Sequence, residues 1–178
     1  MTDREALMEI LKTRSIMKGD FTLASGRKST YYINGKMTTL HSTGLNLVAR
    51  QLLEAIGDLE FDAVGGPVIG ADPIVGALLS VMAERGMDRE GLLIRKASKG
   101  HGTKRLVEGR LEPGMKVVII EDVVTTGGSL LQAAKEVEAA GGEIAAIAVV
   151  VDREEGAAEA IAGAGYSLRS LFRVSELL

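Results

Sequence analysis

The sequence predicts an α/β domain with a central, mostly parallel sheet flanked by helices. Short apolar runs rich in β-branched residues alternate with Ala/Leu/Glu-rich stretches of helical length, which is typical of parallel strands joined by crossover helices. The run Val117–Ile120 is apolar at every position, as expected for a strand covered on both faces. The chain has 178 residues, 46% of them hydrophobic, which suits one domain with a full core.

The N-terminal half is expected to open with a helix. Leu7, Ile10 and Leu11 have the spacing of one helix face, and this helix is extended to Met17 and ended by Gly19. The elements expected after it are a hairpin over 21–35, a helix from an N-cap at Ser42 to about Gly57, a strand over 62–66 and a helix over 73–85 that begins with proline.

The C-terminal half continues the alternation of strands and helices. Its expected elements are a strand over 91–96, a glycine-broken loop to Pro113, a strand over 116–121, a helix over 128–140, a strand over 143–151, a helix over 154–163 and a short strand over 166–172. The sequence has neither an internal repeat nor a linker that would mark a second domain. We therefore expect a single domain over residues 1–178.

Composition and charge argue against several classes of protein. The chain has no Cys, and His41 and His101 lie far apart without a ligand-spaced partner, so no structural metal site is expected. The longest apolar run, Ile144–Val151, is far shorter than the ~20 residues that span a bilayer. A net charge of −3 argues against broad nucleic-acid binding. We expect a soluble, cytoplasmic protein that binds neither membranes nor nucleic acid.

Acidic and small residues follow one of the expected buried strands. Glu121 and Asp122 are placed at its carboxyl end, the edge where open α/β sheets bind ligands. Gly127 and Gly128 are expected in the first turn of the next helix, where each costs roughly 0.5–1 kcal/mol relative to Ala. Free backbone N–H groups and hydroxyls within 125–129 would form a phosphate site. Acids beside a phosphate suit a phosphorylated sugar, because its hydroxyls or a bridging metal ion can face them.

A simpler reading treats Thr126 as an ordinary N-cap and the acids as solvated side chains at a strand end. A lone Thr-Gly-Gly would favour that reading. The paired acids and the full spacing favour the phosphate site instead. Neither a G-x-x-x-x-G-K-[ST] loop nor a strand-borne G-x-G-x-x-G occurs in the chain, which argues against P-loop and dinucleotide-binding proteins.

The segment VVIIEDVVTTGGS at 117–129 resembles the phosphoribosyl diphosphate (PRPP) binding signature of the type I phosphoribosyltransferases. Three further segments make the chain similar to the orotate phosphoribosyltransferases of that family: GDFTLASGRKSTYYINGK at 19–36, IRKASKGHGTKRLVEG at 94–109 and VVVDREEG at 149–156. The resemblance spans nearly the whole chain.

This resemblance implies a fold and an activity. The fold is that of the type I phosphoribosyltransferases, with a small hood at about 1–40, a core at about 41–178 and a mobile catalytic loop at about 95–109. The activity is transfer of the 5-phosphoribosyl group from PRPP to orotate, giving orotidine 5′-monophosphate and pyrophosphate in de novo UMP biosynthesis. Mg²⁺ is expected to bind through PRPP rather than to a set of protein ligands. A homodimer with shared active sites is also implied.

The resemblance also implies the residues of the site. The expected catalytic residues are Arg95, Lys96, Lys99 and His101. PRPP is expected to bind these four residues together with Glu121, Asp122, Val123, Val124, Thr125, Thr126, Gly127, Gly128 and Ser129. Orotate is expected to bind Thr125 and Arg153.

The charges of the expected catalytic loop agree with this assignment. From Arg95 onward, the loop contains no acidic residue before Glu108. Glycines at 100 and 102 would let the loop close over pyrophosphate and exclude water. Taken alone, the loop is equally well explained as an exposed, solubilising segment. The neighbouring phosphate site favours the ligand. The cations of the loop are Arg95, Lys96, Lys99, Lys104 and Arg105.

Two positions depart from the family pattern. Many relatives carry lysine where this chain has Ala24, and another lysine within the turn that reads PVIGADP at 67–73. Fewer cations are therefore available for the diphosphate. Gly65, Gly66 and Gly70 are expected to let backbone amides approach it instead.

Two alternative functions remain open at this point. A PRPP-sensing or nucleotide-sensing regulator of the same fold would keep the phosphate site and lose the basic loop. A salvage phosphoribosyltransferase for another base would share the phosphate site and lack Arg153 as the partner of a carboxylated base.

Overall fold

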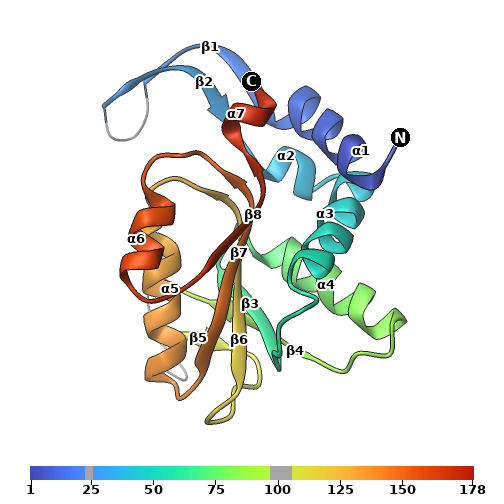
Figure 1. Ribbon diagram of the computed structural model, residues 1–178, viewed down its shortest axis with the longest axis vertical. Coiled ribbons are helices and arrows are strands. Elements are labelled where there is room, and N and C mark those ends of the chain that lie inside the picture. Colours follow the sequence, from blue (N-terminus) through green and yellow to red (C-terminus); the bar gives the residue numbers. More distant parts are fainter. Residues whose placement is uncertain (23–25, 97–105) are drawn as a thin grey trace.

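The computed structural model describes residues 1–22, 26–96 and 106–178, and its centre is a six-stranded sheet (Figure 1). The strands lie in the order β5-β4-β3-β6-β7-β8, and all neighbours are parallel except β4 and β5. Their bounds are β3 Ala63–Pro67, β4 Glu90–Ile94, β5 Val107–Glu108, β6 Lys116–Val124, β7 Glu143–Asp152 and β8 Leu168–Arg173. The predicted α/β class with a mostly parallel sheet is confirmed.

Helices cover both faces of the sheet, so its strands are buried on two sides (Figure 1). One face carries α1 Asp3–Ile10, α3 Ser42–Ala55 and α4 Asp72–Glu84, and the other carries α5 Gly128–Ala139 and α6 Ala157–Gly163. Because successive side chains of a strand point to opposite faces, a strand between two helical layers must be apolar at every position.

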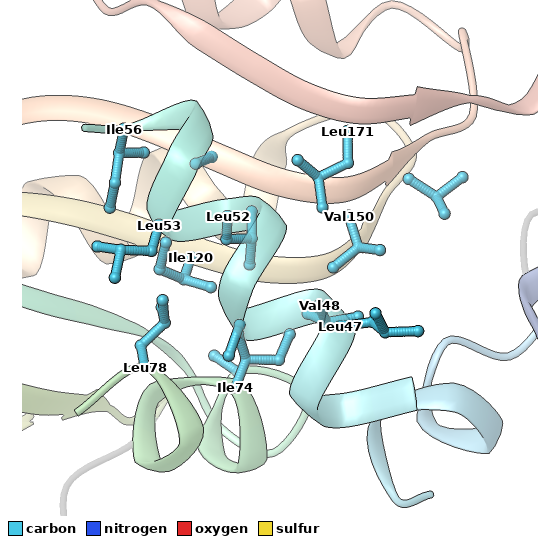
Figure 2. Close-up of a cluster of buried hydrophobic side chains, with 14 of the residues drawn as sticks. Leu47, Val48, Leu52, Leu53, Ile56, Ile74, Leu78, Ile120, Val150 and Leu171 are labelled. Atoms are coloured by element: carbon cyan, nitrogen blue, oxygen red, sulfur yellow. The ribbon is translucent and has the colours of Figure 1, made fainter. Parts of the chain in front are cut away.

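The central strand β6 shows this directly. Val118 and Ile120 belong to the apolar layer formed with α3 and α4, whereas Val117 and Ile119 belong to the layer under α5 and α6. Figure 2 shows the first layer, in which leucine and isoleucine side chains of α3 and α4 surround Ile120. This two-sided burial explains the continuous apolar run in the sequence.

The N-terminal segment forms a hairpin that stands apart from the main sheet (Figure 1). β1 Ile16–Thr22 and β2 Lys28–Ile33 pair antiparallel as a separate two-stranded sheet. The hairpin predicted over 21–35 is therefore present, although its first strand begins earlier, at Ile16. Short helical segments complete the fold: the π-helix η1 Leu11–Ser15, α2 Lys36–Thr39 and α7 Val174–Leu177.

The first helical segment ends sooner than predicted. It stops at Ser15 rather than continuing through Met17 to Gly19. The Ser15 carbonyl accepts the Asn34 N–H at 2.9 Å, and its hydroxyl lies 2.7 Å from that of Thr38. These contacts, made with residues distant in the sequence, draw the chain into β1.

The starts of α3 and α4 each lie one position from the prediction. The N-cap of α3 is His41 rather than Ser42, because the imidazole Nδ1 accepts the Gly44 N–H at 3.3 Å. Histidine is not among the preferred caps, so the neighbouring serine was the natural choice. In α4, Asp72 is the first helical residue and Pro73 the second.

Several elements in the C-terminal half also differ from the prediction, among them β4, which ends at Ile94 rather than 96, and β8, which begins at Leu168 rather than 166. β6 continues past Glu121 to Val124. α6 begins at Ala157 rather than Glu154, because Glu154 and Gly156 have φ values of 58° and 98°, in the left-handed region. The expected loop after β4 contains β5, which is too short to leave a periodic pattern.

Candidate active site

The sheet topology creates a crevice at the carboxyl ends of two neighbouring strands. The chain leaves β3 for α4 on one face, and it leaves β6 for α5 on the other. Since β3 and β6 are paired, their following loops diverge from a common edge. Such a switch in direction is where open α/β sheets bind ligands.

A hollow of about 130 Å³ lies at the loop between β6 and α5. Gly127 is the N-cap of α5 with a left-handed φ of 88°, and no side chain caps the helix. The reading of Thr126 as an ordinary N-cap is therefore wrong. The first N–H groups of α5 have no side-chain cap, which suits an anion. The hollow is lined by Glu121, Val123, Val124, Thr125, Thr126, Gly127, Gly128, Ser129 and Leu130.

The two acids of β6 lie beneath two glycine-containing turns. A Cβ added to Gly35, just after the hairpin, would lie 2.5 Å from Asp122 Oδ2. A Cβ added to Gly70, in the turn after β3, would lie 2.5 Å from Glu121 Oε1 and 2.7 Å from Asp122 Oδ1. Asp122 is only 7% exposed. Glycine at both positions thus lets the backbone approach the carboxylates, and a larger residue would have to displace them.

The glycines of the β3 region do not all act as predicted. Gly65 and Gly66 are buried within β3, where an added Cβ would collide with Leu92 and with the Ile120 carbonyl oxygen. They serve close packing inside the sheet rather than backbone approach to a ligand. Gly70 alone among the three lies beside the acids.

Burial sets the protonation of Glu121. Removal from water, reinforced by the negative charge of Asp122, raises the pKa of Glu121 from 4.5 to about 8. Lys36 opposes the shift. Glu121 is therefore largely protonated at neutral pH in the ligand-free protein, and a bound cation would favour its ionised form.

The raised pKa of Glu121 predicts a pH-dependent stability. The folded protein holds the Glu121 proton more tightly than the unfolded chain does. The contribution of Glu121 to the free energy of unfolding is therefore complete below about pH 4.5 and is lost as the pH rises through about 8. The glutamine of Glu121→Gln stays neutral at every pH in this interval. The melting temperature of this variant should therefore fall less than that of the wild type as the pH rises from about 4.5 to about 8. Calorimetric scans of both proteins across the interval test this. Parallel curves would contradict it.

Arg153 follows β7 at the same edge of the sheet. Its backbone N–H donates to the Val124 carbonyl at 3.0 Å, which brings it beside Thr125. The side chain is 8% exposed, and its guanidinium carbon lies 5.2 Å from the centre of the Tyr31 ring. Nη2 lies 3.0 Å from Glu155 Oε1, whereas the buried Nε has no hydrogen-bond partner among the described residues. An unpartnered buried donor suits an anionic ligand.

Tyr31 and Glu155 were not among the predicted site residues. Tyr31 comes from β2, far from Arg153 in the chain, and an aromatic residue in a hairpin strand is an ordinary occurrence. Glu155 lies two residues from Arg153, so its proximity could have been noticed. Its orientation toward the guanidinium could not.

Arg95 and Lys96 follow β4 and reach the start of α5. Together with Gly128 and Ser129 they line a cavity of about 320 Å³. Arg95 also lies 3.7 Å from the carboxylate of Glu108. The structure thus brings these two cations next to the glycine loop that precedes α5. The other predicted catalytic residues, Lys99 and His101, lie outside the described residues, as does Ala24.

The acids at this edge fit a metal ion carried by a substrate. In the described part of the chain, no three His, Asp or Glu side chains converge as a metal site. Mg²⁺ is commonly held by one or two carboxylates together with substrate phosphates, and Glu121 and Asp122 offer carboxylates beside the hollow at the loop between β6 and α5.

The helices of residues 1–22, 26–96 and 106–178 all lack the length and hydropathy of a membrane span.

Comparison with known proteins identifies the family. A model of the phosphoribosyl transferase domain matches residues 40–165. The chain is 43% identical to the orotate phosphoribosyltransferase of Streptomyces avermitilis over 175 residues, which cover 98% of this chain and 96% of that protein.

Solved structures agree. The crystal structure of Mycobacterium tuberculosis orotate phosphoribosyltransferase in complex with Fe(III) dicitrate matches with a TM-score of 0.87 and 39% identity, over 99% of both chains. The complex of the same enzyme with PRPP gives a TM-score of 0.84 and 36% identity, again over 99% of both chains. The glycine loop, the paired acids and these full-length similarities together place the chain in the orotate phosphoribosyltransferases, members of the type I phosphoribosyltransferase family.

Proposed function

We propose that this chain transfers the 5-phosphoribosyl group from PRPP to orotate, releasing pyrophosphate. The observation that carries the proposal is the presence of two complementary sites on one sheet edge. The glycine loop before α5 suits a phosphate, and the buried Arg153 has an unpartnered Nε that suits the carboxylate of a base. The relative solved with PRPP supports the same assignment.

The reaction needs orientation and electrostatic stabilisation more than proton transfer. A ring nitrogen of orotate attacks carbon 1 of PRPP and releases its proton to solvent, and the bond from that carbon to oxygen breaks with its electron pair leaving on pyrophosphate. The loop 125–129 would hold the 5′-phosphate, and Glu121 and Asp122 would face the ribose hydroxyls and the positive charge that develops on the ring. A hood at about 1–40 would cover the base, since Tyr31 lies against Arg153.

Positive charge at the leaving group completes the proposed mechanism. Arg95 and Lys96 lie beside the phosphate loop and would face the diphosphate. From family resemblance, Lys99 and His101 of the catalytic loop at about 95–109 would join them. Mg²⁺ bound with PRPP would neutralise further negative charge on the diphosphate.

A panel of bases tests the activity. The protein is mixed with PRPP, Mg²⁺ and one base at a time, and pyrophosphate release is followed. We expect release with orotate and little with hypoxanthine, adenine or uracil. Turnover of one of those bases without orotate turnover would favour a salvage enzyme, and no turnover with any base would favour a PRPP-sensing regulator.

We also propose a homodimer with shared sites, supported by apolar surface near the acids. Met37 and Leu40 follow Gly35, and Ile69 precedes Gly70, so both segments leave from the glycines that touch the Asp122 carboxylate. The three large side chains are 48%, 72% and 69% exposed, respectively. Exposed apolar side chains on the two segments that leave the acids suit a subunit contact.

Leu40→Asp is expected to convert the protein to a monomer with little turnover, because a charge would replace apolar contact area at an interface that completes the site. Size-exclusion chromatography with light scattering gives the mass, and pyrophosphate release gives the turnover. Leu178→Asp, at the exposed C-terminus, is the control. A Leu40→Asp monomer with wild-type turnover would contradict shared sites, and an unchanged mass would contradict this location of the interface.

A further inference from the structure

The side chain of Glu155 links two parts of the molecule that are distant in sequence. Oε1 lies 3.0 Å from Nη2 of Arg153, and Oε2 accepts a hydrogen bond from Nη2 of Arg27. Arg153 follows β7, whereas Arg27 directly precedes β2 in the hairpin. The Glu155 side chain is only 15% exposed, so one nearly buried carboxylate is shared by two guanidinium groups.

The Arg153 guanidinium is thereby held from two directions. The face of the Tyr31 ring lies on one side at 5.2 Å, and the Glu155 carboxylate engages Nη2. Nε remains buried, and no group in residues 1–22, 26–96 or 106–178 forms a hydrogen bond with it. A buried guanidinium is costly without a counter-ion, and a carboxylate that fixes one nitrogen also determines where the remaining donors point.

The hairpin needs such a link. β1 and β2 form their own two-stranded sheet, and a two-stranded hairpin is marginally stable by itself. The pair between Arg27 and Glu155 ties the hairpin to the loop after β7, while Tyr31 brings its ring to Arg153. Loss of Glu155 would therefore release both the guanidinium and the hairpin above it.

We propose that Glu155 is a positioning residue for the base site: it holds Arg153 in the orientation that receives the carboxylate of the base, and through Arg27 it docks the hairpin over that site. The inference rests on the proposed function. It predicts that Glu155 acts on the base substrate and leaves the phosphate and ribose sites, which lie on other loops, unaffected.

Glu155→Gln tests the proposal, with Glu154→Gln as the matched control. Glu154 lies on the same loop and carries the same charge, but it accepts the Ser175 N–H and is exposed. Glu155→Gln should raise the KM for orotate about tenfold or more, since charge-assisted hydrogen bonds are worth about 1.5–3 kcal/mol. The KM for PRPP should stay within about twofold of the wild-type value, the usual range for a substitution that removes no specific contact with the ligand. Glu154→Gln should leave both constants unchanged.

Arg27→Gln separates the docking of the hairpin from the orientation of Arg153. This variant can also be measured if Glu155→Gln fails to fold. It keeps the pair between Glu155 and Arg153, so the KM for orotate should rise less than in Glu155→Gln. An orotate KM unchanged in Arg27→Gln would overturn the docking role.

Provided that the wild type turns over orotate, three results for Glu155→Gln would overturn the positioning role. The first is that Glu155→Gln has the same KM values as Glu154→Gln, and the second is that its KM values for orotate and PRPP rise equally. The third is a fall in the KM for orotate, which would make Glu155 a competitor of the substrate carboxylate. Failure of the wild type to release pyrophosphate with orotate, while another base is turned over, would instead overturn the proposed function and this inference with it.

Discussion

Asp122→Asn is expected to lower kcat about 100-fold, the scale on which loss of one preorganised electrostatic group acts. The carboxylate lies at the ligand edge of β6, between the Gly35 and Gly70 turns, and it would face the charge that develops on the ribose. The asparagine keeps the size of the side chain and an oxygen that can accept the Val123 N–H, which Asp122 Oδ1 accepts at 2.9 Å. The change is thus confined to charge.

The fold should tolerate this substitution. Because Glu121 is largely protonated at neutral pH, little charge repulsion is lost with the Asp122 charge, and the asparagine can still accept the Val123 N–H, so the melting temperature should change little. Asp62→Asn is the control, because Asp62 accepts the Lys116 N–H at the opposite end of the same strand. Turnover is measured at saturating substrates and scaled to the folded fraction. A large loss of melting temperature with wild-type turnover per folded molecule would show that Asp122 is structural.

Arg153→Ala is expected to weaken orotate binding by roughly 10-fold to 150-fold, which corresponds to one charge-assisted hydrogen bond of about 1.5–3 kcal/mol. PRPP binding should change far less, because the phosphate loop and the acids lie on β6 and its following loop. Titration calorimetry with each substrate measures the two affinities separately.

Some loss of stability accompanies this change. Arg153→Ala removes one of the two cations that face Glu155, and the carboxylate keeps Arg27. Affinities are therefore compared at a temperature where both proteins are folded. Arg50→Ala, which removes an ion pair with Asp3 on the helices of the far layer, is the control. Equal weakening of both substrates in Arg153→Ala would count against a role specific to the base.

Features encoded within one short segment were predictable from the sequence. The apolar run of β6, the two acids that follow it and the glycine loop before α5 lie within about a dozen consecutive residues, so their order along the chain already places them at one strand end. Arg153 was predicted from the family resemblance, and the structure places it after β7 at the same edge. The family resemblance added the identity of the substrates, which strand periodicity does not contain.

Element boundaries were less predictable, because tertiary contacts decide them. Ser15 ends the first helical segment through bonds to Asn34 and Thr38, and β5 exists only as an addition to the edge of β4. Neither contact leaves a local pattern. The alternation of apolar residues shows that a face is buried and does not say against which partner.

The tertiary structure alone decided which distant residues complete the site. Gly35 and Gly70 meet the Asp122 carboxylate, and Tyr31 and Arg27 of the hairpin meet Arg153 and Glu155. A glycine, a tyrosine or an exposed arginine is common in turns and strands, so none of these residues stands out in the sequence. The physical reason is that hydrogen bonds, ring contacts and close backbone approach act over a few ångströms in space, and folding brings together segments that are separated by more than a hundred residues along the chain.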